Sequence, residues 1–139
     1  MLLAVDSSVI IASLVEKEEF HEQCKKLMKK VSDADYAVVA PYTVLVEIVA
    51  AIKRRTGSGE LAERIGNDLL RMETVYFFEL SEFRAKEAAE IARKTGMRGM
   101  DSIVVQVAKE NNAGLITLDK DMAEKAKTIV KIVEVKKIS

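Results

Sequence analysis

Short apolar segments alternate with helix-like segments along the chain, and this alternation restricts the fold more than any other feature. The predicted strands are residues 2–5, 36–40, 75–78, 115–117 and 129–135. Strands that are separated in this way by helices form a parallel sheet covered on both faces. We therefore expect a three-layer α/β domain with a sheet of about five parallel strands.

The segments between the predicted strands have the periodicity or the end signals of helices. The expected helices are residues 9–15, 19–31, 42–56, 59–72, 82–95, a short helix that begins at Asp101, and 122–128. Gly57 and Gly96 are good helix stops, and Ser81 is a good N-cap. Since we find no internal repeat or linker, residues 1–139 are expected to form one domain.

Composition narrows the class of protein. Lys+Arg and Asp+Glu each number 22, so the formal net charge is zero and no global field would steer a nucleic acid to the protein. Cys24 is the single cysteine, which argues against a disulfide framework or a thiolate zinc site and agrees with a cytoplasmic location. No apolar run approaches the roughly 20 residues of a membrane helix, so we expect no membrane contact.

Acidic side chains occur where the predicted strands end and helices begin. Asp6 follows the first strand, Asp119 follows the fourth, Asp101 opens the helix that precedes this fourth strand, and Glu47 lies in the helix after the second strand. Functional groups of open α/β sheets gather beyond the carboxyl ends of the strands. We therefore expect these four acids to meet in one pocket.

Each acid taken alone has a plainer interpretation. Asp6, Asp101 and Asp119 stand at positions where an aspartate commonly caps a helix. Asp121, beside a lysine, fits an ordinary surface acid.

Glu47 lies in a helix that is apolar on almost every side, which is typical of a buried helix. With Thr43 and Arg54 it forms a narrow polar stripe at about 100° per residue. This stripe either faces solvent or pairs locally with a basic residue, or it faces a polar cleft. A glutamate is seldom buried without a partner.

A pocket of carboxylates requires compensation. Two carboxylates ~5 Å apart repel by roughly 3 kcal/mol at an effective dielectric of 20. Protonation or a bound cation relieves the repulsion. No His or Cys accompanies these acids, and oxygen ligands alone favour Mg²⁺ or Mn²⁺. Such ions activate water for attack on a phosphodiester, so the pattern indicates nuclease chemistry.

The order of these motifs resembles the PIN-domain ribonucleases, and the short chain is similar to their VapC-type toxins. The residues that carry the resemblance are Asp6 with Ser7 and Ser8, Glu47, Asp101, and Thr117-x-Asp119-x-Asp121. It implies that Asp6, Glu47, Asp101 and Asp119 are catalytic and hold Mg²⁺ or Mn²⁺, with Asp121 as a further acid at the metal. It also implies that the hydroxyls of Ser8 and Thr117 orient carboxylates or water.

The same resemblance implies the partners. The substrate would be RNA, the protein would be a homodimer, and a small antitoxin would inhibit it by placing a basic side chain in the acidic cleft. A PIN-like nuclease of RNA processing, or an RNA- or partner-binding protein with little turnover, is the alternative.

Basic residues near the acids are candidates for contact with RNA phosphates. Lys53 and Arg54 end the Glu47 helix, and Arg98 precedes Asp101. The plainer interpretation of Lys53 and Arg54 is a solvated helix end favoured by the helix dipole.

Two other enzyme or signalling classes fit poorly. A phosphoacceptor domain would have an aspartate after the third strand, where this chain has Glu79 and Leu80. A dehalogenase-like phosphatase would have a second acid two residues after Asp6, where this chain has Ser8.

Overall fold

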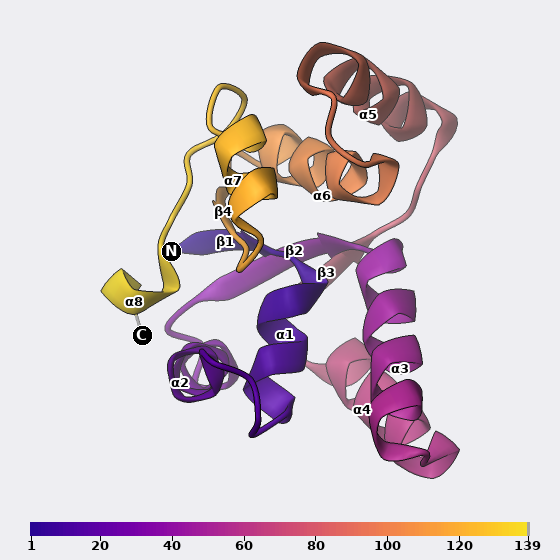
Figure 1. The fold of residues 1–139 in the computed structure, drawn as a ribbon, viewed down its shortest axis with the longest axis vertical. Coiled ribbons are helices and arrows are strands. Elements are labelled where there is room, and N and C mark those ends of the chain that lie inside the picture. The colour runs from indigo at the N-terminus through magenta and orange to yellow at the C-terminus, as the bar shows by residue number, and fades with distance from the viewer. Residues whose placement is uncertain (139) are drawn as a thin grey trace.

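A parallel sheet runs through the middle of the molecule in the computed structural model, which describes residues 1–138 (Figure 1). Its strands are β1 (Leu2–Val5), β2 (Ala37–Pro41), β3 (Val75–Phe78) and β4 (Gly114–Ile116). Their order in the sheet is β3-β2-β1-β4, and every neighbouring pair is parallel. The predicted parallel α/β class is confirmed.

The fifth predicted strand is wrong. Residues 129–135 make a single parallel bridge, Leu115 with Ile132, beside the short edge strand β4. The Leu115 amide donates to the Lys131 carbonyl at 2.8 Å, and the Val133 amide donates to the Leu115 carbonyl at 2.9 Å. Because β4 has only three residues, it offers too short a ladder for a fifth strand, and the chain then turns into a terminal helix.

Helices cover both faces of the sheet, as predicted. They are α1 (Ser7–Leu14), α2 (His21–Ser32), α3 (Tyr42–Thr56), α4 (Gly59–Arg71), α5 (Glu82–Thr95), α6 (Gly99–Glu110), α7 (Lys120–Ala126) and α8 (Val135–Ile138). Helices α1 to α4 lie on one side, and α5 and α6 lie on the other (Figure 1). Among residues 1–138, no helix combines the length and the hydropathy needed to cross a membrane.

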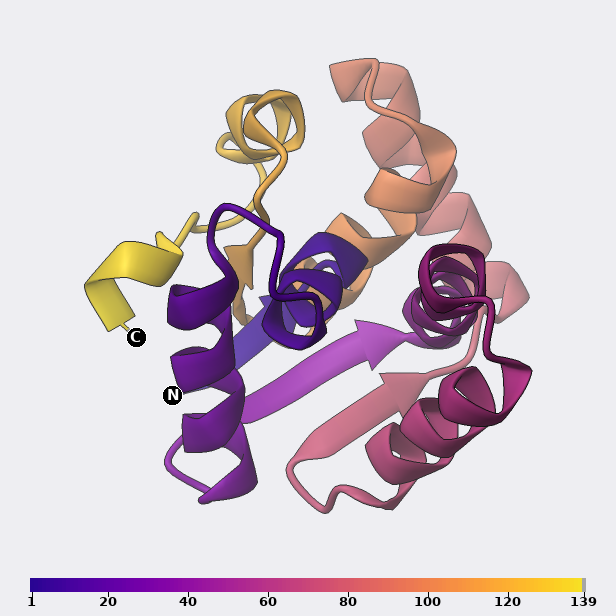
Figure 2. The same cartoon turned by 60° about the horizontal axis from the view of Figure 1, so that its bottom comes forward.

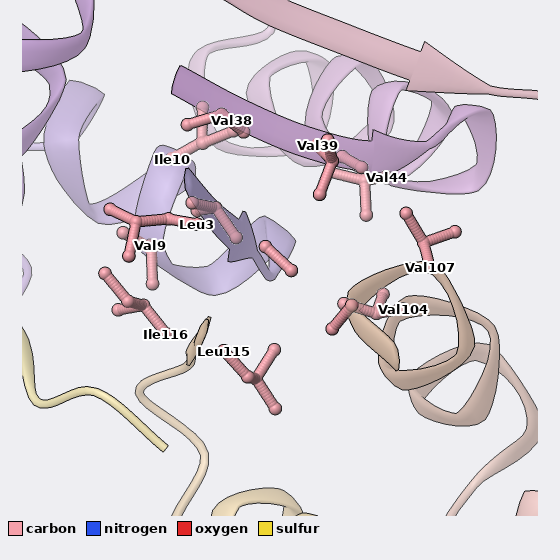
Figure 3. Close-up of a cluster of buried hydrophobic side chains, with 14 of the residues drawn as sticks. Leu3, Val9, Ile10, Val38, Val39, Val44, Val104, Val107, Leu115 and Ile116 are labelled. Atoms are coloured by element: carbon pink, nitrogen blue, oxygen red, sulfur yellow. The ribbon is translucent and has the colours of Figure 1, made fainter. Parts of the chain in front are cut away.

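The core fills the space between the central strands and helices α1, α3 and α6. Figure 3 labels ten of its side chains: Leu3, Val9, Ile10, Val38, Val39, Val44, Val104, Val107, Leu115 and Ile116. All ten are buried, and Leu3, Val9, Val38, Val44 and Leu115 are 0% exposed. Both faces of β1 and β2 are covered, which explains why these strands are continuous apolar runs rather than alternating ones.

The parallel arrangement brings the carboxyl ends of β1, β2 and β3 to the same side of the molecule (Figure 2). Helix α1 begins two residues after β1 ends, and α3 begins directly after β2. Side chains at the start of these helices are therefore held at the sheet edge by buried strands rather than by long loops.

Candidate active site

Asp6 is fixed by two hydroxyl groups from opposite ends of the chain. It follows β1 and is only 7% exposed. Its carboxylate oxygen Oδ2 accepts hydrogen bonds from Ser8 Oγ at 2.8 Å and from Thr117 Oγ1 at 2.9 Å. Its side chain makes no cap bond to α1, although Asp6 occupies the N-cap position. The capping interpretation therefore does not account for this carboxylate.

The same two hydroxyls attach the segment after β4 to the segment after β1. Ser8 Oγ accepts from the Leu118 amide at 3.2 Å, and Thr117 Oγ1 accepts from the Asp119 amide at 3.1 Å. Each hydroxyl donates to one group and accepts from another. This small network sets the position of Asp119 relative to Asp6, although the two residues are far apart in the sequence.

Asp119 has both the capping role and a place among the acids. Its Oδ1 accepts from the amides of Asp121 and Met122 at 3.0 and 3.1 Å, which caps α7. Its other oxygen, Oδ2, accepts from Arg98 Nη2 at 2.5 Å. One carboxylate oxygen thus serves the fold, and the other points toward the charged groups of the site.

Asp101 lies in the first turn of α6 and does not occupy the N-cap position, which Arg98 holds. Its Oδ2 accepts from Arg98 Nε at 3.3 Å. Burial raises the pKa of Asp101, and the charges of Asp6 and Asp119 add to this rise, whereas Arg98 opposes it. Asp101 is therefore within electrostatic reach of Asp6 and Asp119.

Glu47 completes the group from α3. Burial raises its pKa, the charges of Asp6 and Asp101 raise it further, and a hydrogen bond from Ser7 and the charge of Arg98 lower it. Its side chain is half-buried, and the charges that shift its pKa place it near Asp6 and Asp101. One helical turn earlier, the Thr43 hydroxyl oxygen is buried and has no hydrogen-bond partner among the described residues.

A family model for the PIN domain matches residues 3–128. The chain belongs to the PIN domain family. It is 29% identical to Ribonuclease VapC3 of Pyrobaculum aerophilum over 135 residues, which cover 94% of this chain and 98% of that protein.

Solved structures with the same fold include a VapC toxin and a chain of a toxin-antitoxin complex. VapC20 of Mycobacterium tuberculosis, described as a Sarcin-Ricin loop cleaving toxin, has a TM-score of 0.73 at 19% identity, covering 95% of this chain and 98% of that one. A toxin-antitoxin complex from Klebsiella pneumoniae contains a chain with a TM-score of 0.61 at 18% identity, covering 88% and 91%. At these identities the likeness concerns the fold.

The donor set of this PIN domain suits a hard divalent cation. Four carboxylates with adjacent hydroxyls offer oxygen ligands alone, which Mg²⁺ and Mn²⁺ prefer. Within residues 1–138, no three acids already stand close enough together to hold an ion. Instead, the guanidinium of Arg98 lies between Asp101 and Asp119. The oxygen atoms of these residues are suitable ligands for Mg²⁺ or Mn²⁺. In the structure, the positive charge beside Asp101 and Asp119 is that of Arg98.

The remaining predicted site residues lie further out. Asp121 is exposed and pairs with Lys125 at 3.1 Å. Lys53 donates to the Gly57 carbonyl at 2.9 Å, so it stabilises the end of α3, and Arg54 is exposed beside it. A role in RNA binding for Lys53 and Arg54 stays a prediction.

Sequence reasoning missed the bridging position of Arg98. It was expected to contact RNA, and in the structure its exposed guanidinium contacts Asp101 and Asp119. The spacing of three residues between Arg98 and Asp101 was a signal for the first contact, because side chains at this spacing are neighbours at the start of a helix. Nothing local in the sequence signals the contact with Asp119.

Proposed function

We propose that this PIN domain protein is a divalent-metal-dependent endoribonuclease that acts in the cytoplasm as the toxin of a toxin–antitoxin pair. The observation that carries the proposal is that carboxylates from separate segments lie within electrostatic reach of one another at the sheet edge. Asp6 is held by the hydroxyl of a residue 111 positions away in the sequence, and its charge is felt by Glu47 and Asp101. The name and coverage of the VapC3 relative support ribonuclease chemistry.

In this proposal Asp6, Glu47, Asp101 and Asp119 would hold Mg²⁺ or Mn²⁺. When bound, such an ion lowers the pKa of a water molecule and stabilises the negative charge that develops on a phosphodiester. Asp121 would contribute negative charge from the rim of the site, where its ion pair with Lys125 keeps it.

The protein's own groups prepare the site. Ser8 and Thr117 fix one rotamer of Asp6, so its carboxylate need not reorganise during the reaction. The partial burial of Glu47 and Asp101 lowers the local dielectric and strengthens every charge interaction there. No side chain is needed as a nucleophile, because water can attack the phosphorus.

Exposed apolar side chains on α3, α5 and α6 support the proposal that this protein binds other proteins. On α3, Val46 is 67% exposed next to Glu47, and on α6, Met100 is 44% exposed next to Asp101. Phe83, at the start of α5, is 63% exposed. We propose that these surfaces serve a homodimer contact and the binding of a small antitoxin, as the toxin-antitoxin complex with the same fold suggests.

Cleavage of an RNA pool by the purified protein tests the proposal. We expect Mg²⁺ or Mn²⁺ to support internal cleavage, chelation to abolish it, and Asp6→Asn to remove it while leaving the protein folded. Expression without an antitoxin should arrest growth for the wild type but not for Asp101→Asn. Wild-type protein that binds RNA but cuts none of it with either ion would favour the binding alternative.

A further inference from the structure

Arg98 contacts two of the four acids through two different nitrogens. Its Nη2 lies 2.5 Å from Asp119 Oδ2, and its Nε lies 3.3 Å from Asp101 Oδ2. The planar guanidinium suits this bridge, since it presents donors in fixed directions. A single positive charge thus stands between two carboxylates that come from α6 and from the start of α7.

The two sides of this bridge differ in burial. The Arg98 side chain is 74% exposed, whereas those of Asp101 and Asp119 are 18% and 29% exposed. The acids are therefore held within the site, and the guanidinium reaches them from solvent. Ion pairs with so exposed a partner are weak, so the bridge can open at little cost.

The backbone of Arg98 is anchored independently of the guanidinium. Its carbonyl accepts from the Ser102 amide at 3.0 Å and from Ser102 Oγ at 3.1 Å, so its position at the N-cap of α6 does not require the side chain. Rotation about side-chain bonds alone would move the charge out of the site.

We propose that Arg98 is a resident cation of the acidic site, which offsets part of the negative charge of Asp101 and Asp119 in the metal-free protein and competes with the divalent ion. This inference rests on the proposed function, because it requires that the four acids bind a metal. A divalent ion held by Asp101 and Asp119 would supply positive charge in place of the guanidinium, and rotation of the exposed Arg98 side chain would free both carboxylates to hold it.

Mn²⁺ binding, followed by calorimetry or by the electron paramagnetic resonance of the free ion, tests the competition. Arg98→Gln removes the charge and keeps the backbone anchor. The matched control is Arg93→Gln, because Arg93 is 69% exposed and pairs with an acid at the same spacing, Glu90. We expect Arg98→Gln to bind Mn²⁺ roughly 3- to 10-fold more tightly than wild type, the range that two exposed ion pairs carry. Arg93→Gln should bind as wild type does.

Thermal unfolding gives a second readout that does not depend on activity. In metal-free buffer Arg98→Gln should melt below wild type, because two acids have lost their counterion, and saturating Mn²⁺ should close this gap. Equal Mn²⁺ affinity in wild type and Arg98→Gln, or weaker binding by the variant, would overturn the proposal that Arg98 competes with the ion. The proposed metal site would not be affected by that result. Wild-type protein that bound no Mn²⁺ at all would instead overturn the proposed function, and this inference with it.

Discussion

Asp6 is buried, and both of its side-chain hydrogen bonds to Oδ2 come from hydroxyls. A buried carboxylate with no cationic partner in contact is costly unless its lone pairs are satisfied. Ser8 and Thr117 supply that satisfaction without neutralising the charge. At the scale of single residues, this combination keeps an anionic oxygen pointed at a fixed place, which a metal ligand requires.

Thr117→Val tests the hydroxyl contribution to the site. The valine keeps the shape of the side chain but loses the bond to Asp6 and the bond from the Asp119 amide. We expect ribonuclease activity to fall about 10- to 100-fold, the usual effect of removing a group that orients a metal ligand. Rate measurements over a range of Mn²⁺ concentrations check this. Activity within twofold of wild type would mean that the hydroxyl serves stability alone.

The raised pKa of Glu47 predicts that the stability of the metal-free protein falls as the pH rises above the ordinary pKa of a glutamate. Burial and two neighbouring acids raise its pKa above the ordinary value of 4.5, so the folded protein binds a proton more readily than the unfolded chain. This contribution is fully present below pH 4.5 and is lost as the pH rises through the higher folded-state pKa.

Urea unfolding of wild type and Glu47→Gln in metal-free buffer, at pH 4 and at pH 7.5, measures this effect. The glutamine is neutral at both values, so the variant should gain stability relative to wild type as the pH rises. A difference that is constant between the two pH values, or that shrinks as the pH rises, would contradict the account of Glu47.

At the scale of elements, the site depends on where helices begin. Helix α7 starts directly after Asp119, whose Oδ1 caps it and whose Oδ2 faces Arg98. Helix α3 starts directly after β2 and carries Glu47 in its second turn. Asp119 therefore caps a helix in addition to its proposed role as a metal ligand, whereas Glu47 caps no helix.

Two substitutions separate the roles of Asp119. Asp119→Asn keeps a carbonyl oxygen for the cap and should lose activity with little loss of stability. Asp119→Ala should lose activity and also about 1 kcal/mol of stability, the usual cost of removing an N-cap. Chemical unfolding with an RNA cleavage assay checks both variants. Full activity in Asp119→Asn would remove this residue from the proposed metal ligands.

Most elements could be predicted because their signals are local. The strands β1 and β3, and the helices α3 and α5, have the predicted bounds, since apolar runs, Ser81 and the two glycines Gly57 and Gly96 define them. The fifth strand could not be judged locally, because a strand needs a partner of sufficient length and β4 is short.

The candidate site also has features that the sequence signals and one feature that it does not signal. The proximity of the acids could be predicted because parallel topology brings strand ends to one edge. The Arg98 bridge could not be, since it depends on how α6 and α7 lie relative to each other. The catalytic and metal-binding roles of the acids stay predictions.

At the scale of the whole molecule, the four acids come from four separate segments that only the folded sheet brings together. An ion held by all of them binds the folded state and not the unfolded chain, so metal binding should stabilise the protein. At a free Mn²⁺ concentration of 100 times the Kd, the stabilisation would be about 2.7 kcal/mol.

Thermal unfolding with and without Mn²⁺ measures this linkage. We expect the wild type to melt at a higher temperature with Mn²⁺ and Asp6→Asn to show little change. An equal rise in both proteins would indicate that the ion binds elsewhere on the surface.

The central claim is that Asp6, Glu47, Asp101 and Asp119 share one divalent ion. A crystal of the protein soaked in Mn²⁺ and measured for anomalous scattering tests it most directly. We expect an anomalous peak coordinated by oxygens of these carboxylates, with the Arg98 guanidinium turned away. A well-ordered crystal at high Mn²⁺ with no peak between these acids, and with Arg98 still bridging Asp101 and Asp119, would contradict it.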